Sequence, residues 1–463
     1  MISALFCRVT NVRNLISRYI LAIFIALSCS QAKTLANGID GNGVGARSMG
    51  MAGADVAWAA DPLSAMGLNP AGLGFLTAPE FDLGGVGGVT QGNFNKPGVS
   101  NGSLEQNPNG LPEGAFGYPL NPQGKWPVTL GLSFVPESSL DADWHYLDPP
   151  GGLGGKTSYG YQQDKSEILV LRSALGASVK IGPKLSIGAS AGLIYNDNQL
   201  DTPYIFQNLQ PGPGGPKNSG YDGAKTLLRL HTTGFGANAQ VGAMFRATSN
   251  LQFGVSYESE THVKSSGNAS GDPSVQFGLP PGSLPFHYDA DVRNVFPQDV
   301  SWGVSWKFHP QWRLALQADW VDWADAFHTL PVSLSDGNNA GVNAALGKSF
   351  TDLIPLNWKD EFVYRAGMEF NVTKSFSLRA GYSYGGSPVP DSTLTPMTAA
   401  IMENILTAGA GYEWQHYRID LAYQYAFPAT QNVGLSGLRS GEYSNSSTEV
   451  SMHVFALTVG VRF

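Results

Sequence analysis

Histidine and serine are the residues most often used in metal sites and as nucleophiles, and neither is placed for such chemistry in this sequence. Two copies of Gly-x-Ser-x-Gly, at 188–192 and 381–385, fall inside alternating segments, whereas a nucleophile elbow needs a strand–turn–helix context. No two histidines lie within four residues of each other, so no His-x-x-x-His metal pair exists. The histidines are at positions 145, 231, 262, 287, 309, 328, 416 and 453.

Acidic pairs are the other candidates for catalysis. Asp141 with Asp143, and Asp289 with Asp291, lie in or near expected loops, and we interpret them as solvated. The sequence therefore predicts no enzyme, no metal site and no cofactor.

The elements that carry these residues alternate in polarity. In 184–196, Leu185, Ile187 and Ala189 share one face and Ser186 and Gly188 share the other. This period of two is typical of a strand with two different faces. A soluble sandwich alternates in the same way, so one strand does not decide the fold.

The breaks between the alternating segments are more informative. Short breaks such as 182–183 and 415–416 are interspersed with long ones rich in Gly, Pro, Asn and Ser. Short turns at one end and long loops at the other are typical of an outer-membrane barrel. We expect fourteen antiparallel strands, near 80–89, 111–118, 126–136, 166–181, 184–199, 226–246, 250–264, 286–308, 312–334, 356–371, 375–386, 404–414, 417–428 and 447–463.

Composition agrees with an all-β transmembrane barrel. The 463 residues include 57 Gly, with 11% aromatic and only 14% charged residues. Aromatic residues such as Trp302, Trp358 and Trp414 cluster toward strand ends, where rings favour the headgroup level of a membrane. The formal net charge of −8 argues against nucleic acid as a partner.

The first 32 residues have the pattern of a signal peptide. Arg8, Arg13 and Arg18 precede an apolar run at 19–27 and small residues at 28–32. An alternative is a lipoprotein signal that ends at Cys29. Because Cys7 and Cys29 are the two cysteines of the chain, removing residues 1–32 would leave no disulfide or cysteine metal site.

Residues 33–79 do not alternate. Ala-rich stretches in which Asp61 or Ser64 could cap a helix indicate short helices joined by glycine turns. We interpret this segment as a plug folded into the barrel of residues 80–463, and a flexible periplasmic arm is the alternative.

Two motifs in this chain resemble those of a known protein family. Residues 60–65 (Ala-Asp-Pro-Leu-Ser-Ala) with 69–73 (Asn-Pro-Ala-Gly-Leu) resemble the N-terminal hatch of the FadL-type transporters of long-chain fatty acids and hydrocarbons. A second match runs from Leu-Asn-Trp-Lys-Asp at 356–360 to Ser-Pro-Val-Pro-Asp at 387–391. The resemblance implies a hatch motif made of Asn69, Pro70, Ala71 and Gly72, an apolar pocket inside the barrel, and exit through the wall beside a kinked strand.

Cations that face the lumen could hold the carboxylate of a fatty acid. By alternation, Arg172, Arg365 and Arg379 face inward, where most cations should pair with acids. The resemblance implies that Lys359 helps to hold the ligand carboxylate, so the candidate ligand-binding residues are Lys359, Arg365, Arg379 and Arg172. Residues 196–201 lack the basic side chains that fatty-acid binders carry there, which favours an uncharged substrate.

We therefore expect a bacterial outer-membrane uptake protein for hydrophobic small molecules, with long-chain fatty acids first and neutral hydrocarbons second. A general diffusion porin or surface receptor is the alternative from another class. The expected partners are the substrate and outer-membrane lipid, and the chain should be monomeric.

Overall fold

The structure, a computed structural model, describes residues 39, 41–213, 215 and 221–463. The expected signal peptide, residues 1–32, lies outside this part of the chain. Among the described residues, no helix is both long enough and apolar enough to cross a bilayer.

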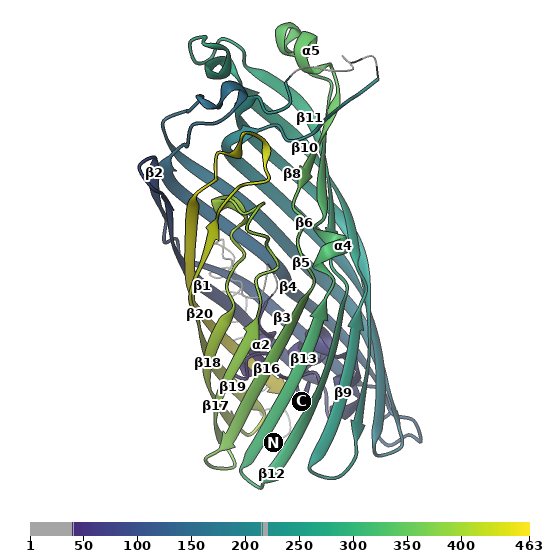
Figure 1. The fold of residues 1–463 in the computed structure, drawn as a ribbon. Helices are drawn as coiled ribbons and strands as arrows, with labels where there is room; N and C mark the ends of the chain where they lie inside the picture. Colours follow the sequence, from purple (N-terminus) through teal and green to yellow (C-terminus); the bar gives the residue numbers. More distant parts are fainter. Residues whose placement is uncertain (1–38, 40, 214, 216–220) are drawn as a thin grey trace, which may run out of the picture.

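Antiparallel strands form one continuous sheet that closes on itself, because β1 pairs with both β3 and the last strand, β20 (Figure 1). Ten of the barrel strands are single segments. These are β1 (Glu80–Lys96), β3 (Asn109–Pro119), β4 (Val128–Leu147), β5 (Tyr161–Ile181), β6 (Leu185–Ile205), β8 (Lys225–Arg246), β17 (Phe376–Gly385), β18 (Asn404–Trp414), β19 (Tyr417–Val433) and β20 (Ser446–Arg462).

The other barrel strands are each interrupted once, which gives four pairs of shorter segments. The pairs are β9 (Leu251–Glu258) with β10 (Thr261–Asp272), β11 (Phe286–Phe296) with β12 (Asp299–His309), β13 (Trp312–Val321) with β14 (Thr329–Ser335), and β15 (Phe350–Pro355) with β16 (Glu361–Asn371). Counting each pair as one strand gives a closed antiparallel barrel of fourteen strands, which confirms the predicted number.

Two short strands and several short helices accompany the barrel strands. The strands are β2 (Ser100–Leu104) and β7 (Leu209–Pro211). The helices are η2 (Leu153–Gly155), η3 (Ser274–Phe277), α4 (Trp323–Ala326), α5 (Ala340–Leu346), η4 (Pro396–Thr398) and η5 (Arg439–Gly441). Figure 1 shows α5 at the end that carries the long loops and α4 about halfway along the barrel.

Several strands are longer than the sequence predicted. β4 extends to Leu147 and β5 begins at Tyr161, inside the loop expected at 137–165, and β15 forms inside the loop expected at 335–355. The end of β4 carries Asp141, Asp143 and His145 on its outer face, so the apolar alternation that marks a membrane strand stops before the strand ends.

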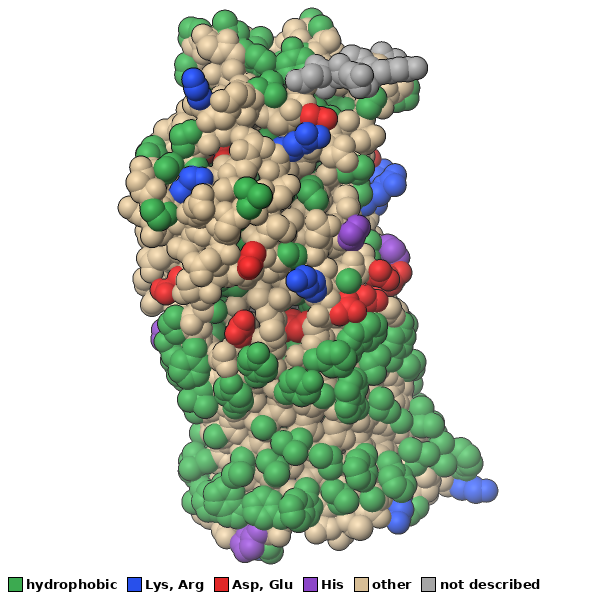
Figure 2. All heavy atoms as spheres, viewed as in Figure 1, with side chains coloured by type: hydrophobic (Ala, Val, Ile, Leu, Met, Phe, Trp, Pro, Cys, Tyr) green, Lys and Arg blue, Asp and Glu red, His purple; other side chains and the backbone are tan. Residues whose placement is uncertain are grey.

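Outward-facing apolar side chains form the surface that meets lipid. Figure 2 shows hydrophobic side chains gathered over the lower half of one face and most charged side chains above them. Exposed outward residues include Leu132, Leu193, Phe235, Trp302, Phe362, Leu421 and Phe455. The buried Trp323 and Trp358 depart from the predicted pattern of aromatic residues at the headgroup level, because they pack on Phe327 inside the barrel.

The segment ahead of β1 folds inside the lower part of the barrel as α2 (Gly45–Met49), α3 (Pro62–Leu68) and η1 (Pro70–Phe75) (Figure 1). We call residues 41–79 the hatch. Asp61 caps α3, since its Oδ1 accepts a hydrogen bond from the backbone N–H of Ser64 at 2.8 Å. Most hatch side chains are buried, as expected for a plug.

Glycines on the inner face of the wall make room for the hatch. A Cβ on Gly188 of β6 would overlap the backbone of Pro70, and a Cβ on Gly254 of β9 would overlap that of Val56. The alternating glycines of the sequence therefore form a surface that lets two backbones approach closely.

Candidate binding cavities, hatch and wall gap

A mostly apolar cavity of about 190 Å³ lies in the upper half of the barrel, and we call it the upper cavity. It is bounded by strands β6, β8 and β11 and by the segments around α4, β15, η4 and η5. Its apolar lining includes Leu140, Ile168, Leu200, Leu230, Val292, Phe327, Leu330, Ile354, Leu356, Trp358, Met397 and Leu438.

One side of the upper cavity carries amide side chains that already satisfy one another. Asn294 donates through Nδ2 to Oδ1 of Asn198 at 3.0 Å, and Asn198 donates to Oγ1 of Thr232 at 3.2 Å. Asn196 behind them accepts a hydrogen bond from Ser265 at 2.7 Å. A network satisfied in this way is rigid and uncharged.

None of the described residues that line the upper cavity is lysine or arginine; its ionisable lining groups are Glu167, Glu442 and tyrosines. Burial raises the pKa of Glu442 to about 7, although Lys225 opposes this shift. The fully buried Lys225 ammonium lies 2.5 Å from Glu442 and 2.6 Å from Asp148, so it forms ion pairs with these two carboxylates. The described lining of the cavity therefore offers no free cation to a ligand.

The structure places the predicted ligand-binding cations elsewhere. Lys359 is exposed in the loop between β15 and β16 and does not line the upper cavity. Arg365 pairs with Asp319 at 2.5 Å, and Arg379 pairs with Glu369 at 2.8 Å and with Asp420 at 2.6 Å.

Arg172 and Arg365 also touch the hatch, next to a second cavity. Arg172 donates to the carbonyl of Met66 at 3.3 Å, and Arg365 donates to the carbonyl of Ala52 at 3.2 Å. Both line the lower cavity, a space of about 140 Å³ between the hatch and the wall that also contains Glu137, Glu258, Asp299 and Asp319. Because acids outnumber arginines there, the lower cavity does not attract an anion.

The hatch motif holds the hatch against strands β8 and β9. Asn69 donates through Nδ2 to the carbonyls of Ala243 at 3.4 Å and Val255 at 3.2 Å, and its Oδ1 accepts from the backbone N–H of Ala71 at 3.1 Å. Pro70 begins η1, where its fixed φ suits a helical first position. The four motif residues are all fully buried or nearly so.

The wall of the barrel opens beside the hatch. Pairing between β3 and β4 stops at Gly114 opposite Phe134, so 109–113 of β3 pair only with β1 and 135–143 of β4 pair only with β5. We call this interval the wall gap. Pro112 and Pro136, one on each side of it, lack the N–H that a ladder needs.

The wall gap adjoins both cavities. Pro136, Glu137 and Ser138 line the lower cavity, and the N–H of Ser139 donates to the carbonyl of Ile39, a residue of the upper-cavity lining, at 3.1 Å. The sequence analysis did not locate this gap. The residues that could have indicated the gap are Pro112 and Pro136, which lie within expected strands.

This arrangement is that of a plugged barrel with an interior apolar cavity. The sequence matches a family model described as "Outer membrane protein transport protein (OMPP1/FadL/TodX)" over residues 27–463. The chain belongs to this family. Its members are outer-membrane transporters of fatty acids or hydrocarbons, so this chain is a β-barrel transporter of the bacterial outer membrane and not an enzyme.

Individual relatives of this FadL/TodX-family protein are distant. The long-chain fatty acid transport protein of Escherichia coli (strain K12) is 21% identical over 404 residues, which are 82% of this chain and 84% of the relative. A crystal structure of the P. putida toluene transporter TodX matches with a TM-score of 0.69 and 20% identity, covering 91% of this chain and 99% of that one. A Pseudomonas aeruginosa FadL homologue matches with a TM-score of 0.68 and 17% identity, covering 92% and 100%.

Proposed function

We propose that this FadL/TodX-family transporter takes up uncharged hydrophobic small molecules, such as aromatic or aliphatic hydrocarbons, which bind in the upper cavity. The observation that carries the proposal is the lining of that cavity, which is apolar, includes a self-satisfied amide patch and contains no lysine or arginine among its described residues. The toluene transporter TodX is one of the solved structures with this fold.

Electrostatics supports an uncharged ligand. An ionised carboxylate that leaves water without a partner costs several kcal/mol or more. In the upper cavity its neighbours would include Glu167 and Glu442 rather than a cation. A hydrocarbon avoids this cost and gains roughly 25 cal/mol for each Å² of apolar surface that it buries.

Long-chain fatty acids, which the sequence analysis expected first, are the second candidate. The observation in their favour is that Lys359 directly follows Trp358, which lines the cavity. A fatty acid could place its tail in the cavity only if its carboxylate reached this exposed lysine. The E. coli relative carries the name of a long-chain fatty acid transport protein.

The route we propose runs from the long-loop end into the upper cavity, past the hatch and lower cavity, and out through the wall gap into the membrane. Pro136 and its neighbours support the last step because they belong both to the wall gap and to the lower-cavity lining. A hydrophobic molecule that leaves through the wall enters the membrane directly and does not have to pass into water below the hatch.

Filling the upper cavity tests its role. Leu230→Trp adds bulk at a buried lining residue of β8, and we expect toluene binding to the purified protein, measured by calorimetry, to weaken at least about tenfold. The matched control is Leu193→Trp, at a position that is 56% exposed on the lipid face of β6. If Leu230→Trp keeps its heat-resistant barrel and binds toluene as the wild type does, the ligand is not in the upper cavity.

A further inference from the structure

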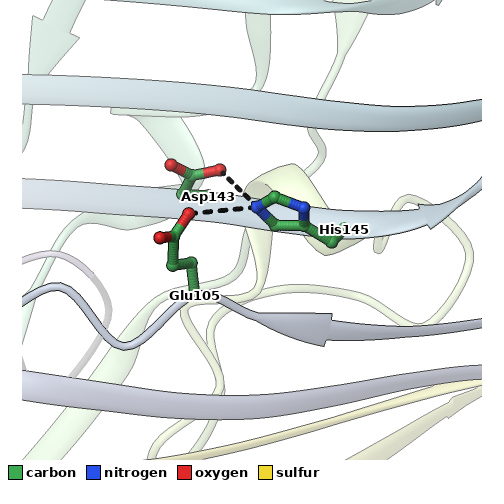
Figure 3. Close-up of side chains that lie close together, drawn as sticks. All are labelled: Glu105, Asp143 and His145. Carbon is green, nitrogen blue, oxygen red and sulfur yellow. Dashed lines mark hydrogen bonds and ion pairs between the residues drawn. The ribbon is translucent and has the colours of Figure 1, made fainter.

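Three metal-ligating side chains meet on the outer surface of the barrel, away from both cavities. Glu105 follows β2, and Asp143 and His145 lie two residues apart on β4, so they share its outer face. Figure 3 shows the imidazole pointing at both carboxylates: Nε2 of His145 lies 3.0 Å from Oε2 of Glu105 and 3.6 Å from Oδ1 of Asp143. One ligand atom from each residue lies within 4.8 Å of the others.

The backbone holds this triad together before any ligand arrives. β2 pairs with β4 with Ser103 opposite His145, and the N–H of Glu105 donates to the carbonyl of Asp143 at 2.7 Å. Because both strands are fixed at this point, closing the three side chains around an ion requires only side-chain rotation.

We propose that Glu105, Asp143 and His145 bind a divalent transition-metal ion of the Zn²⁺ class. Zinc takes His nitrogen at about 2.0–2.1 Å and carboxylate oxygen at about 2.0–2.2 Å in tetrahedral geometry, so two of its ligand atoms are roughly 3.4 Å apart. The observed separations of 3.0 and 3.6 Å fall on either side of this value. An imidazole ligand favours zinc, copper or nickel over calcium or magnesium, which prefer oxygen.

Exposure allows an ion to enter and to keep a water molecule as its fourth ligand. The side chain of Glu105 is 44% exposed and that of His145 is 31% exposed, whereas Asp143 is 10% exposed and firmly held. One buried and two accessible ligands form a site that opens toward the outside of the barrel.

Two side chains of β5 compete with an ion for Asp143. Gln163 donates through Nε2 to both carboxylate oxygens at 3.1 Å. The charged competitor is Lys165, whose ammonium lies 3.3 Å from Oδ2 of Asp143, the carboxylate oxygen that does not face His145. The lysine side chain is 55% exposed, and exposed pairs of this kind are weak and readily exchanged for water. Removing the charge of Lys165 should therefore strengthen metal binding.

The site lies at the upper end of the wall gap. On its β3 side β4 has no strand partner from Val135 to Asp143, the N–H of Glu105 bonds the carbonyl of Asp143, and pairing with β2 begins at Trp144. A metal ion bound by Glu105 from one side and by Asp143 and His145 from the other would cross-link β2 to β4 at this edge. This proposal does not depend on the ligand of the upper cavity.

Calorimetric titration of ZnCl₂ into the chelator-treated, full barrel tests the site, with the protein purified through a tag that contains no histidine. We expect one strong equivalent in the wild type, binding at least about tenfold weaker in His145→Ala and in Glu105→Gln, and tighter binding in Lys165→Met. The matched control is His231→Ala, because His231 lies 3.1 Å from Asp197 in a comparable exposed pair that lacks a third ligand.

Competition with calcium distinguishes coordination through the imidazole from cation binding by surface carboxylates alone. Calcium at millimolar concentration should not displace zinc, because it gains little from an imidazole. The proposal is overturned if the wild type shows no stoichiometric binding, if His145→Ala binds as the wild type does, or if His231→Ala loses as much affinity as His145→Ala.

Discussion

At the scale of single residues, several basic side chains inside this barrel are already paired with acids. Arg379 is held between Glu369 and Asp420, Arg365 is held by Asp319, and Lys225 is held by Asp148 and Glu442. Breaking a buried pair of this kind on one side costs about 3–5 kcal/mol. A ligand carboxylate would therefore have to compete with acids that are already in place.

Lys359 is the candidate cation that remains exposed, and its removal distinguishes the two proposed ligand classes. Lys359→Met should leave toluene binding unchanged within about twofold, because a hydrocarbon gains nothing from an ammonium. Calorimetry on the purified variant measures this. The fatty-acid proposal makes the opposite prediction for laurate, whose affinity should fall roughly ten- to a hundredfold if the ammonium holds its carboxylate.

The position of Lys359 also shows where alternation stops being informative. Asn357 has a φ of +53°, a left-handed conformation that interrupts the extended backbone between β15 and β16. Alternation counted through 356–360 therefore does not give the true direction of the Lys359 side chain. Arg172, Arg365 and Arg379 lie inside the regular strand segments β5, β16 and β17, and alternation placed them correctly on the inner face.

At the scale of elements, the close fit between the hatch and the inner wall is the main feature. Gly188 faces Pro70, Gly254 faces Val56, and Gly381 faces the backbone of Met51 and Ala52. From the sequence, alternation places Gly188 on the face opposite the apolar side chains of its strand. Alternation could not predict which part of the hatch each glycine meets, because that depends on the packing of segments far apart in the chain.

Gly188→Ala tests this fit. The added methyl group would overlap the backbone of Pro70, which cannot rotate away as a side chain could, so we expect a loss of about 1–3 kcal/mol in hatch docking. Faster hydrogen exchange in residues 69–75, with an intact barrel, would report the loss. Gly386→Ala is the control, since nothing lies within 4 Å of a Cβ there. Equal protection in both variants would contradict the close fit.

The proposed role of the wall gap as the exit leads to a prediction about ligand release. Ser138→Trp adds bulk between the lower cavity and the gap, at a residue that does not itself line the upper cavity. We expect toluene binding to the purified protein to be retained and uptake by cells to fall severalfold, because release is blocked while capture is not. Leu132→Trp, on the lipid face of the same strand, is the control. Normal uptake by Ser138→Trp would exclude the gap as the exit.

At the scale of the whole molecule, a period-two pattern and a sorted set of loop lengths were sufficient to predict the fourteen-stranded barrel. Both signals are local, because every strand that faces lipid on one side and the lumen on the other must alternate. The upper cavity draws its lining from β6, β8 and β11 and from loops near 327, 395 and 440. No local pattern brings those segments together, so the cavity could be described only from the structure.

Equilibrium binding of a matched pair of ligands, dodecanol and laurate, tests the central claim most directly, since the two share a hydrocarbon chain and differ in charge. Calorimetry of the wild-type protein at pH 7 should show dodecanol binding at least about tenfold tighter than laurate, because no described residue that lines the upper cavity is a lysine or arginine that could offset the loss of carboxylate hydration. Tighter binding of laurate, abolished by Lys359→Met, would contradict the account and identify the protein as a fatty-acid transporter.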